Sequence, residues 1–526
     1  MIIGFLKPES TNKAIIFSMS MSLVAKVLTF IQSLAISYAF GAQKSTDILF
    51  YGVSLVLLLT SIVSSINQQV IVPNVISIRN TRSEEESGSL ISFIYFIYLI
   101  VGILGSVVLF VFPAKVLSLL SRFTTGDIEA NIVTIRFIIP TFIFILINTY
   151  ILDILASYRY FTLPMFLDMA KNLIIIACIM LLKGRFSVTS LAIGIFCGNA
   201  LQFIVLNFMM LKMLNWRLSV KYYPVENNVR KNILYVIMGQ LMAFIHGFIT
   251  MYLLSGFDSG VFTAMDYGQK ITVVIISVVI GQISTVVGMN IIELHSIGDY
   301  RSLNTVFLNY LKKSMLLVLP GCLILALNSH SVIYVLFQRG RFTEEDVRIT
   351  AGFFLLFTLA IPLRLVDTFV VRLIIAKQIQ RISFLWQIFY NALSVPMIFL
   401  LVYSVGYYGY PLGELVASTL YITLQFRFLL KKQFTYIDTS LLAKFLMVVL
   451  AINLAASGAV LLILKNIRFE WTLFNNILIP AVTFTLYTIV VVPACCLFKC
   501  TREPVADLLG HLADFLRRKI QITKEC

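Results

Sequence analysis

Charged residues interrupt the long apolar stretches of this sequence at a small number of positions. Lys26 is the only charged residue between positions 14 and 39, and Lys270 opens a later stretch directly after Gln269. A charge at the centre of a lipid bilayer costs about 3 kcal/mol, so it usually faces a cavity or a partner of opposite sign. Because Lys26 has no acidic neighbour in its own stretch, we predict that it lines a polar cavity. Lys270 either lines the same cavity or extends its ammonium group to the membrane surface.

Two pairs of opposite charge stand in other apolar stretches, each with a spacing of three residues. Asp168 precedes Lys171, and Arg364 precedes Asp367. Residues three apart share a helix face, so either pair could neutralise itself and hold helices together. The alternative is that Lys171 and Arg364 join the two lysines in a cationic chamber. Such a chamber suits a substrate that carries phosphate, because basic groups replace the water that the anion loses on entry.

Uncharged polar residues and one histidine add further candidates. Gln32 lies in the same apolar stretch as Lys26. We include it among the substrate-binding residues, although an amide in a membrane span more often joins two helices. His246 is either a proton-carrying group or a packed hydrogen-bond donor. We group it with Asp47 and Asp367 as candidate coupling or gating residues.

These side chains must be positioned by elements that use lipid as their solvent. The chain is 59% hydrophobic and 13% charged, with a mean hydropathy of +0.93, whereas a soluble protein is about a quarter charged. Apolar stretches of about 20 residues, the length of a membrane-spanning helix, recur along the whole sequence. The stretches are continuous and not alternating, which argues against the strands of a membrane barrel. The sequence therefore predicts an all-α polytopic membrane protein.

About fourteen transmembrane helices are expected, and the first is too long for a cleavable signal. Their predicted bounds are 14–39, 48–76, 89–112, 131–156, 163–182, 188–211, 232–255, 269–292, 311–335, 350–375, 384–404, 412–430, 441–464 and 473–498. Lys and Arg gather in the loops on the side that holds both termini, which the positive-inside rule assigns to the cytoplasm. The net charge of +16 is thus explained by topology, and no nucleic-acid partner is expected.

The loop between the sixth and seventh spans is strongly basic and resembles a joint between two halves. A weak repeat supports this division, since Ala156 and Asn172 in the first half correspond to Ala376 and Asn391 in the second. Two six-helix halves are a common transporter plan. Beyond the last span, apolar residues recur at helical spacing from 503 to 519, which predicts an amphipathic helix on the inner leaflet. The expected parts are a six-helix lobe over 1–215, a second over 216–435, two additional helices over 436–500 and a cytoplasmic tail over 501–526.

No metal site, cofactor or enzymatic centre is predicted. The seven cysteines lack the paired spacing of a zinc site, and the four histidines are scattered. A membrane-embedded enzyme that polymerises glycans would need clustered carboxylates or histidines on large loops. The loops here are short, so we expect a transporter and not an enzyme.

Two motifs resemble one transporter family. The first span leads into F-G-A-x-x-x-T-D at 40–47, and the loop after the ninth span reads F-Q-R-G-R-F-T at 337–343. Together with a Val-Pro exit of the second span, these patterns resemble the MviN/MurJ proteins of the multidrug/oligosaccharidyl-lipid/polysaccharide exporter superfamily. The resemblance runs from about residue 18 to residue 378.

The resemblance implies a fold and an activity. The fold would be two six-helix lobes around a central cavity, plus two C-terminal helices, in the cytoplasmic membrane of a bacterium. The activity would be the flipping of a polyprenyl-pyrophosphate-linked glycan by alternating access, and in peptidoglycan makers that glycan lipid is lipid II. The implied partners are this substrate and membrane lipids, with a coupling ion or the membrane potential as the driving force.

The sequence departs from the family pattern among its cavity residues. Lys26 and Lys270 stand where the family has arginine, which keeps the charge and loses the two-pronged hydrogen bonding. Gln32 and Ser33 replace an Arg-Asp pair. An exopolysaccharide or O-antigen unit is therefore an alternative substrate to lipid II. A cation-coupled drug exporter of the same superfamily is another alternative, but it would require intramembrane carboxylates, in which the sequence is poor.

Overall fold

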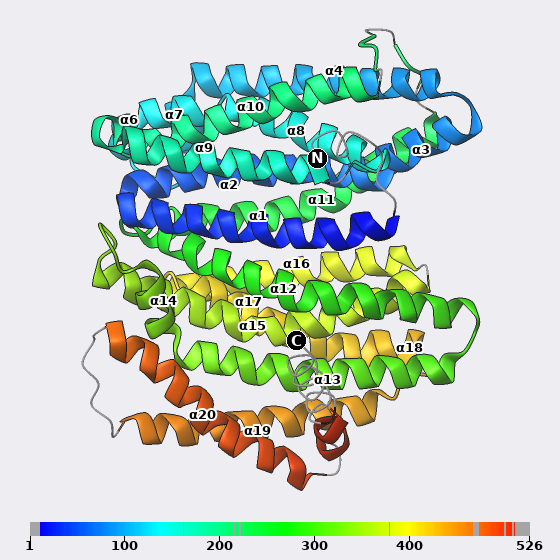
Figure 1. Cartoon of the computed structure of the whole chain (residues 1–526), viewed down its shortest axis with the longest axis vertical. Helices are drawn as coiled ribbons and strands as arrows, with labels where there is room; N and C mark the ends of the chain where they lie inside the picture. The colour runs from blue at the N-terminus through cyan, green and yellow to red at the C-terminus, as the bar shows by residue number, and fades with distance from the viewer. Residues whose placement is uncertain are drawn as a thin grey trace, which may run out of the picture. The chain divides into compact units, whose positions relative to one another are not determined.

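A computed structural model describes residues 11–160, 162–214, 216–219, 222–224, 226–377, 379–465, 473–498, 501–507 and 510. These residues form helices joined by short turns, with no strand among them (Figure 1). The chain divides into two compact units. The first unit comprises residues 1–267 and 337–346, and the second comprises residues 268–336 and 347–526.

Within the described residues, the first unit contains the helices α1 to α11, a π-helical turn, the start of α12 and the ends of α14 and α15 that flank residues 338–343. Their bounds are α1 (Thr11–Phe40), α2 (Lys44–Ile66), η2 (Asn67–Ile71), α3 (Val72–Thr81), α4 (Glu84–Val111), α5 (Pro113–Leu120), α6 (Thr125–Ala130), α7 (Ile132–Ile138), α8 (Thr141–Ser157), α9 (Thr162–Phe186), α10 (Thr189–Met213) and α11 (Asn227–Leu254). The π-helical turn η2 joins α2 and α3 into one continuous helix over Lys44–Thr81.

Helix α8 lies in the core of the first unit. Its residues Ile147, Ile151 and Ile154 are fully buried and recur at the spacing of one helix face. Tyr150 on the same helix donates a hydrogen bond of 2.8 Å to the carbonyl oxygen of Ile91 on α4. The apolar stripe and this buried hydrogen bond fix α8 against its neighbours.

The second unit consists of the remaining helices. Their bounds are α12 (Val261–Ser296), α13 (Tyr300–Leu327), α14 (Ser329–Phe337), α15 (Glu344–Ala376), α16 (Gln380–Val405), α17 (Gly409–Leu424), η3 (Gln425–Leu430), α18 (Lys431–Gln433), α19 (Thr439–Lys465) and α20 (Leu473–Leu497). The short ends of α12, α14 and α15 belong to the first unit.

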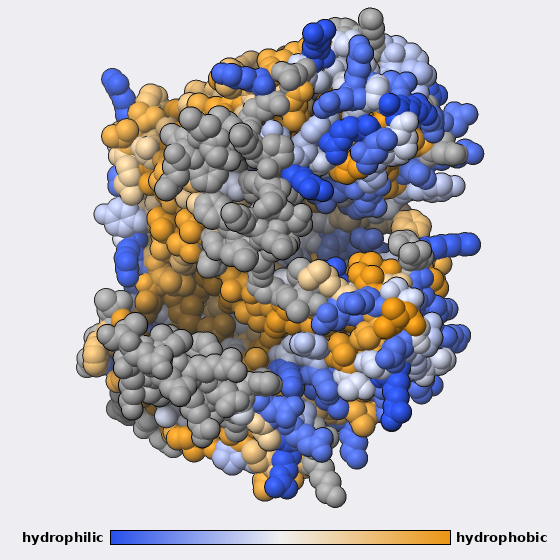
Figure 2. Space-filling model, turned by 45° about the vertical axis from the view of Figure 1, so that its right-hand side comes forward, coloured by the Kyte–Doolittle hydropathy of each residue, from blue (hydrophilic) through white to orange (hydrophobic). Residues whose placement is uncertain are grey.

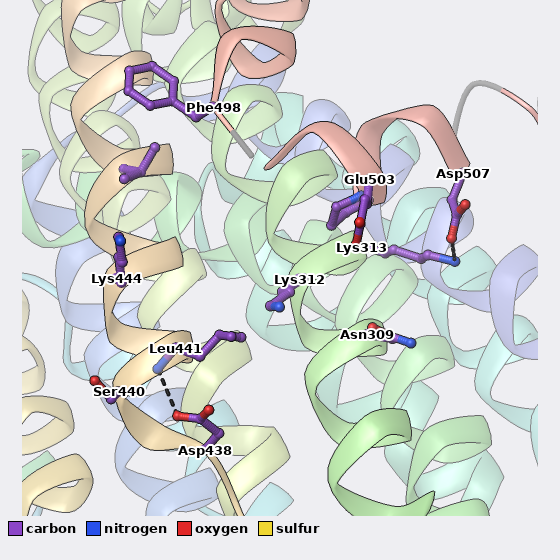
Figure 3. A pocket seen from close by; sticks show the side chains of 12 residues that line it. Asn309, Lys312, Lys313, Asp438, Ser440, Leu441, Lys444, Phe498, Glu503 and Asp507 are labelled. Carbon is purple, nitrogen blue, oxygen red and sulfur yellow. Dashed lines mark hydrogen bonds and ion pairs between the residues drawn. The ribbon is translucent and has the colours of Figure 1, made fainter. Parts of the chain in front are cut away.

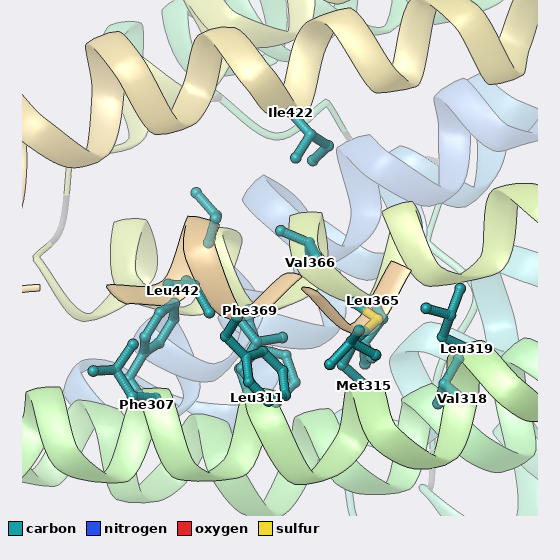
Figure 4. Close-up of a cluster of buried hydrophobic side chains, with 14 of the residues drawn as sticks. Phe307, Leu311, Met315, Val318, Leu319, Leu365, Val366, Phe369, Ile422 and Leu442 are labelled. Atoms are coloured by element: carbon teal, nitrogen blue, oxygen red, sulfur yellow. The ribbon is translucent and has the colours of Figure 1, made fainter. Parts of the chain in front are cut away.

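The core of the second unit is organised along one face of α13. Phe307, Leu311 and Met315 recur every four residues on this face and are almost fully buried. They meet Leu365 and Phe369 of α15 in one apolar cluster (Figure 4). Each fully buried side chain of this size contributes about 2 kcal/mol relative to exposure. The cluster therefore ties α13 and α15 into a stable frame.

The prediction of an all-α polytopic membrane protein is confirmed. Within the described residues, twelve helices are long and apolar enough to cross a membrane. Every predicted span overlaps a helix, and the two not counted among the twelve fall on α1 and on α17 with η3. The number fourteen is therefore approximate. The predicted span 311–335 is misplaced, because the helix it marks is Tyr300–Leu327 and the helix breaks at Asn328 before α14. Apolar side chains cover large continuous areas of the face shown in Figure 2, and most hydrophilic side chains gather in separate areas.

The predicted lobe boundaries remain a prediction. The sequence placed a boundary at 215/216, whereas the first compact unit also contains α11, which packs against α2. Of the predicted amphipathic tail, residues 501–507 are helical. Residues 508–509 and 511–526 lie outside the described part of the chain.

Candidate functional site

Lys26 is half-buried on α1, the helix that packs against α9. One turn further on, the Thr29 hydroxyl accepts a hydrogen bond of 3.0 Å from the Asn172 amide of α9. Gln32 is also half-buried on α1, but a six-residue separation places it about a third of a turn away from Lys26. The two predicted cavity residues of α1 therefore do not share one face of the helix.

Lys171 on α9 is held in a local ion pair. Its ammonium lies 2.8 Å from a carboxylate oxygen of Asp168. The amide of Gln202 on α10 bridges the pair, donating to Asp168 at 3.0 Å and accepting from Lys171 at 3.4 Å. The neutralised pair thus has the geometry expected of a contact that joins α9 to α10.

Asp47, on the first turn of α2, binds the first turn of α12. One carboxylate oxygen accepts from the backbone N–H of Gly260 at 2.7 Å. The other accepts from the backbone N–H and the hydroxyl of Thr263, at 2.8 and 2.6 Å. Asp47 is only 1% exposed. A buried carboxylate at a helix N-terminus satisfies backbone N–H groups that have no partner within the helix.

The two motifs recognised in the sequence meet in the first unit. The backbone N–H of Arg341 donates to the carbonyl oxygen of Tyr38 at 3.2 Å. Gly41 and Gly340 both have positive φ, of 66° and 64°. A Cβ at Gly340 would collide with the Tyr38 carbonyl, and one at Gly41 with the Arg341 carbonyl. Both glycines are therefore required for the backbone of the 337–346 loop to approach the end of α1.

Aromatic rings complete this contact. The ring centroid of Tyr267 lies 5.1 Å from that of Phe337, 5.8 Å from that of Phe342 and 5.7 Å from that of Phe50. Tyr267 is fully buried. Pairs at these separations add about 1 kcal/mol beyond the burial of their surface. The ring cluster therefore fixes the 337–346 loop and the first turns of α12 against α2.

In the second unit, Arg364 and Asp367 of α15 line a pocket of about 560 Å³. Asp367 accepts a hydrogen bond of 3.1 Å from the Gln425 amide. Among the described residues, no ion pair within 4.0 Å joins Arg364 to Asp367, and Arg364 is exposed. Glu414 of α17 also lines the pocket and accepts from the Tyr390 hydroxyl of α16 at 3.0 Å.

A family model described as "Lipid II flippase MurJ" matches residues 36–482, which include most of both units. The chain belongs to the lipid II flippase MurJ family. Family membership and the apolar helices place it in the inner membrane as a multi-pass protein.

Individual relatives are distant. The chain is 24% identical over 352 residues to a "Probable lipid II flippase MurJ" of Buchnera aphidicola, covering 63% of this chain and 66%, just under two thirds, of the Buchnera protein. It is 21% identical over 429 residues to a protein of the same name from Borreliella burgdorferi, covering 80% of this chain and 84% of that protein.

Solved structures share the fold of the MurJ family. "Lipid II flippase MurJ, inward closed conformation" matches with a TM-score of 0.73 and 17% identity, over 90% of this chain and 98% of that one. An inward-facing multidrug resistance MATE family transporter of the MOP superfamily matches with a TM-score of 0.64 and 14% identity, over 82% of this chain and 99% of that one.

Two acids with hydrogen-bond partners inside the helices were missed in the sequence. Asp153 of α8 accepts hydrogen bonds from Asn67 at 3.2 Å and from Gln68 at 3.3 Å, both in the π-helical turn η2. Glu414 is the second. Each is the only carboxylate in its predicted span, although Arg136 and Arg427 also lie in those spans. An intramembrane charge is the kind of signal that identified Lys26, so similar reasoning could have found both.

Two predicted residues, Lys270 and His246, remain to be located. Lys270 is half-buried on α12, three residues after the point where α12 passes into the second unit. His246 is half-buried on α11, and its carbonyl oxygen accepts from the Thr250 hydroxyl at 3.0 Å.

Proposed function

We propose that this protein flips a polyprenyl-pyrophosphate-linked glycan across the cytoplasmic membrane by alternating access. The observation that carries the proposal is the match of the lipid II flippase MurJ family over residues 36–482. A cation-coupled drug exporter is not favoured, because the likeness to a multidrug transporter concerns the fold alone. The family is one of transporters, and we assign the protein no enzymatic step.

Basic side chains within the spans are proposed to bind the diphosphate. Lys26, Lys270 and Arg364 are the positively charged side chains proposed for this role. Each charge-assisted hydrogen bond to phosphate is worth about 2 kcal/mol. Lys171 contributes less, because Asp168 already neutralises it at 2.8 Å. Gln32 is proposed as an uncharged contact to the same substrate.

Asp47 is proposed to act in gating and not in substrate binding. Its hydrogen bonds to Gly260 and Thr263 hold the start of α12 to the first unit, while the rest of α12 belongs to the second. Asp367 and His246 are proposed as coupling residues. The membrane potential favours the return of an empty cationic site, since one charge crossing 100 mV is worth about 2.3 kcal/mol.

The proposed topology has both termini in the cytoplasm, from the distribution of basic loops. The proposed lobes are residues 1–215 and 216–435, with two additional helices over 436–500. A tag that reports accessibility, placed in the loop after α10 and in the loop between α19 and α20, tests this orientation. Labelling of the first loop from outside the cell would contradict it.

The glycan is either lipid II or an exopolysaccharide or O-antigen unit. Lipid II is the substrate that the relatives' names give. The second candidate is favoured by the replacement of family arginines by Lys26, Lys270 and Gln32, since lysine binds a diphosphate through fewer fixed hydrogen bonds.

Depletion of the protein in its own cells, followed by identification of lipid-linked glycans on the inner leaflet, tests the proposal. Accumulation of lipid II supports the first substrate, and accumulation of another polyprenyl-linked glycan supports the second. If no such lipid accumulates while the protein is depleted, the flippase proposal is wrong. Expression in a bacterium whose own lipid II flippase is depleted provides the complementary test, because growth is restored only if lipid II is accepted.

A further inference from the structure

A second pocket lies within the second unit, away from Arg364 and Asp367. It has a volume of about 840 Å³ and lies between α13, α19 and the helical residues 501–507 (Figure 3). The proposed transport function uses none of its residues, and the two C-terminal spans have no assigned role.

The walls of the pocket carry three lysines. Lys312 and Lys313 come from α13, and Lys444 comes from α19, the helix that packs against α13. Figure 3 shows the side chains of Lys312 and Lys444 on these two facing helices. Asn309 and Ser440 add uncharged hydrogen-bond donors to the lining. Ammonium and amide donors on two neighbouring helices can replace the hydration of a phosphate group.

The pocket also has an apolar side and lies beside the first half of α13, at the start of α19 and at the end of α20. Leu441 and Phe498 line it. Asn304 of α13 accepts from the backbone N–H of Asp438 at 3.2 Å, and Asp438 in turn accepts from the N–H of Leu441 at 2.9 Å at the start of α19. Helix α20 ends at Leu497, next to Phe498. Basic pockets between span ends, with apolar residues beside them, occur where lipid headgroups lie.

The residues that follow α20 place carboxylates against the lysines. A carboxylate oxygen of Asp507 lies 3.1 Å from the ammonium of Lys313, and Glu503 also lines the pocket. Val505, between them, is buried in the core of the second unit. Thr501 is buried and donates to the carbonyl oxygen of Phe498 at 3.1 Å. The segment is therefore docked, and its acids occupy positions that an anionic ligand would take.

We propose that this pocket binds the phosphate of an anionic phospholipid, and that Glu503 and Asp507 compete with that phosphate for the lysines. The occupant is a bilayer lipid, because the pocket combines cationic donors with an apolar side where α19 begins and α20 ends. The competition makes the ion pair of Asp507 with Lys313 depend on the anionic lipid content of the leaflet. This inference goes beyond the proposed transport function and does not depend on it.

Lipid binding to the purified full-length protein tests the proposal. The affinities for phosphatidylglycerol and phosphatidylcholine are compared by native mass spectrometry in detergent. We expect phosphatidylglycerol to bind more tightly. Lys444→Gln should lower the affinity for phosphatidylglycerol about fivefold. Lys312→Gln combined with Lys313→Gln should lower this affinity by a similar factor for each lysine. Lys431→Gln with Lys432→Gln, outside the pocket lining, is the matched control and should leave the affinity unchanged.

The acidic residues provide a test of opposite sign. Glu503→Gln with Asp507→Asn should raise the affinity for phosphatidylglycerol about two- to fivefold, because an exposed ion pair is released. A merely structural role for the segment would lower the affinity instead. Equal binding of the two phospholipids, or unchanged binding by Lys444→Gln, would overturn the proposal. The lysine variants could instead leave the affinity for phosphatidylglycerol unchanged and lose the binding of a polyprenyl diphosphate. That result would assign the pocket to the carrier lipid and would also overturn the proposal.

Discussion

Asp47 and Thr263 lie 216 positions apart in the sequence and are joined by two hydrogen bonds to a single carboxylate oxygen. The Thr263 hydroxyl donates at 2.6 Å and its backbone N–H at 2.8 Å. The contact is buried, so water does not compete for the donors. Thr263 lies in the first turn of α12, and α12 passes into the second unit after Tyr267. The contact therefore fixes the part of α12 that belongs to the first unit.

Replacement of Asp47 by asparagine should destabilise the first unit. The amide places an NH2 group against N–H donors and leaves at least one of them unsatisfied, which costs about 1–3 kcal/mol. Thermal unfolding of the purified protein measures the effect. Asp258→Asn is the control, because Asp258 is exposed in the adjoining turn and its carboxylate is not bound by α2. An unfolding temperature equal to that of the unchanged protein would show that the contact contributes no stability.

The contact between the two motifs predicts a difference between two glycines of similar backbone conformation. Gly340 and Gly298 have φ of 64° and 76°. A Cβ at Gly340 would collide with the Tyr38 carbonyl, whereas a Cβ at Gly298 would meet nothing within 4 Å. Gly298→Ala should lower the free energy of unfolding by about 1–2 kcal/mol, which is the penalty of the left-handed backbone conformation for alanine. Gly340→Ala should lower the free energy of unfolding by more than this, because of the added collision with Tyr38, and it should also impair transport.

The measurements for this pair are thermal unfolding and proteolysis of the 337–346 loop. Faster cleavage of this loop in Gly340→Ala than in Gly298→Ala would agree with the close approach. Equal unfolding temperatures and equal cleavage rates for the two variants would show that the backbone does not need to approach Tyr38.

The spans were predictable from sequence because lipid imposes a strong condition on them. A membrane helix must be apolar over about 20 residues, so the predicted spans overlap helices from α1 to α20. Short segments were not predictable. The sequence of the π-helical turn η2 does not differ in pattern from the helices on either side. Its residues Asn67 and Gln68 donate hydrogen bonds to Asp153, which lies too far away in the sequence for a local pattern to reveal.

The candidate site was only partly predictable. The spacing of Asp168 and Lys171 indicated a pair, and the structure contains it. The same spacing suggested a pair of Arg364 with Asp367, but Asp367 is instead bound by Gln425, 58 residues away. Spacing reports which side chains share a helix face, whereas contacts between helices depend on packing that a single sequence does not encode locally. For the same reason the partner of Asp47, on α12, was not foreseen.

The ion pair of Asp168 and Lys171 can be separated from substrate binding by a double-mutant cycle. The variants are Asp168→Asn, Lys171→Gln and the two together. Since the side chains are 43% and 24% exposed, solvent screens the pair. We expect a coupling energy of about 0.5–1 kcal/mol in unfolding, with transport largely restored in the double variant. Transport that is lost in Lys171→Gln and not restored by Asp168→Asn would assign Lys171 to the substrate instead.

The charge of Lys26 provides the test of the proposed diphosphate site. Lys26→Gln removes the charge from α1 and should weaken binding of the lipid-linked glycan by about tenfold or more, because a charge-assisted hydrogen bond to phosphate is worth about 1.5–3 kcal/mol. Lys26→Arg keeps the charge and should retain or improve binding, since arginine adds a two-pronged contact. The measurements are the affinity of the purified protein for the accumulated lipid and glycan export in cells. Lys115→Gln, at α5, is the control with the same loss of charge elsewhere in the first unit. If Lys26→Gln binds and exports like Lys115→Gln, the intramembrane charge serves packing and the diphosphate is bound elsewhere.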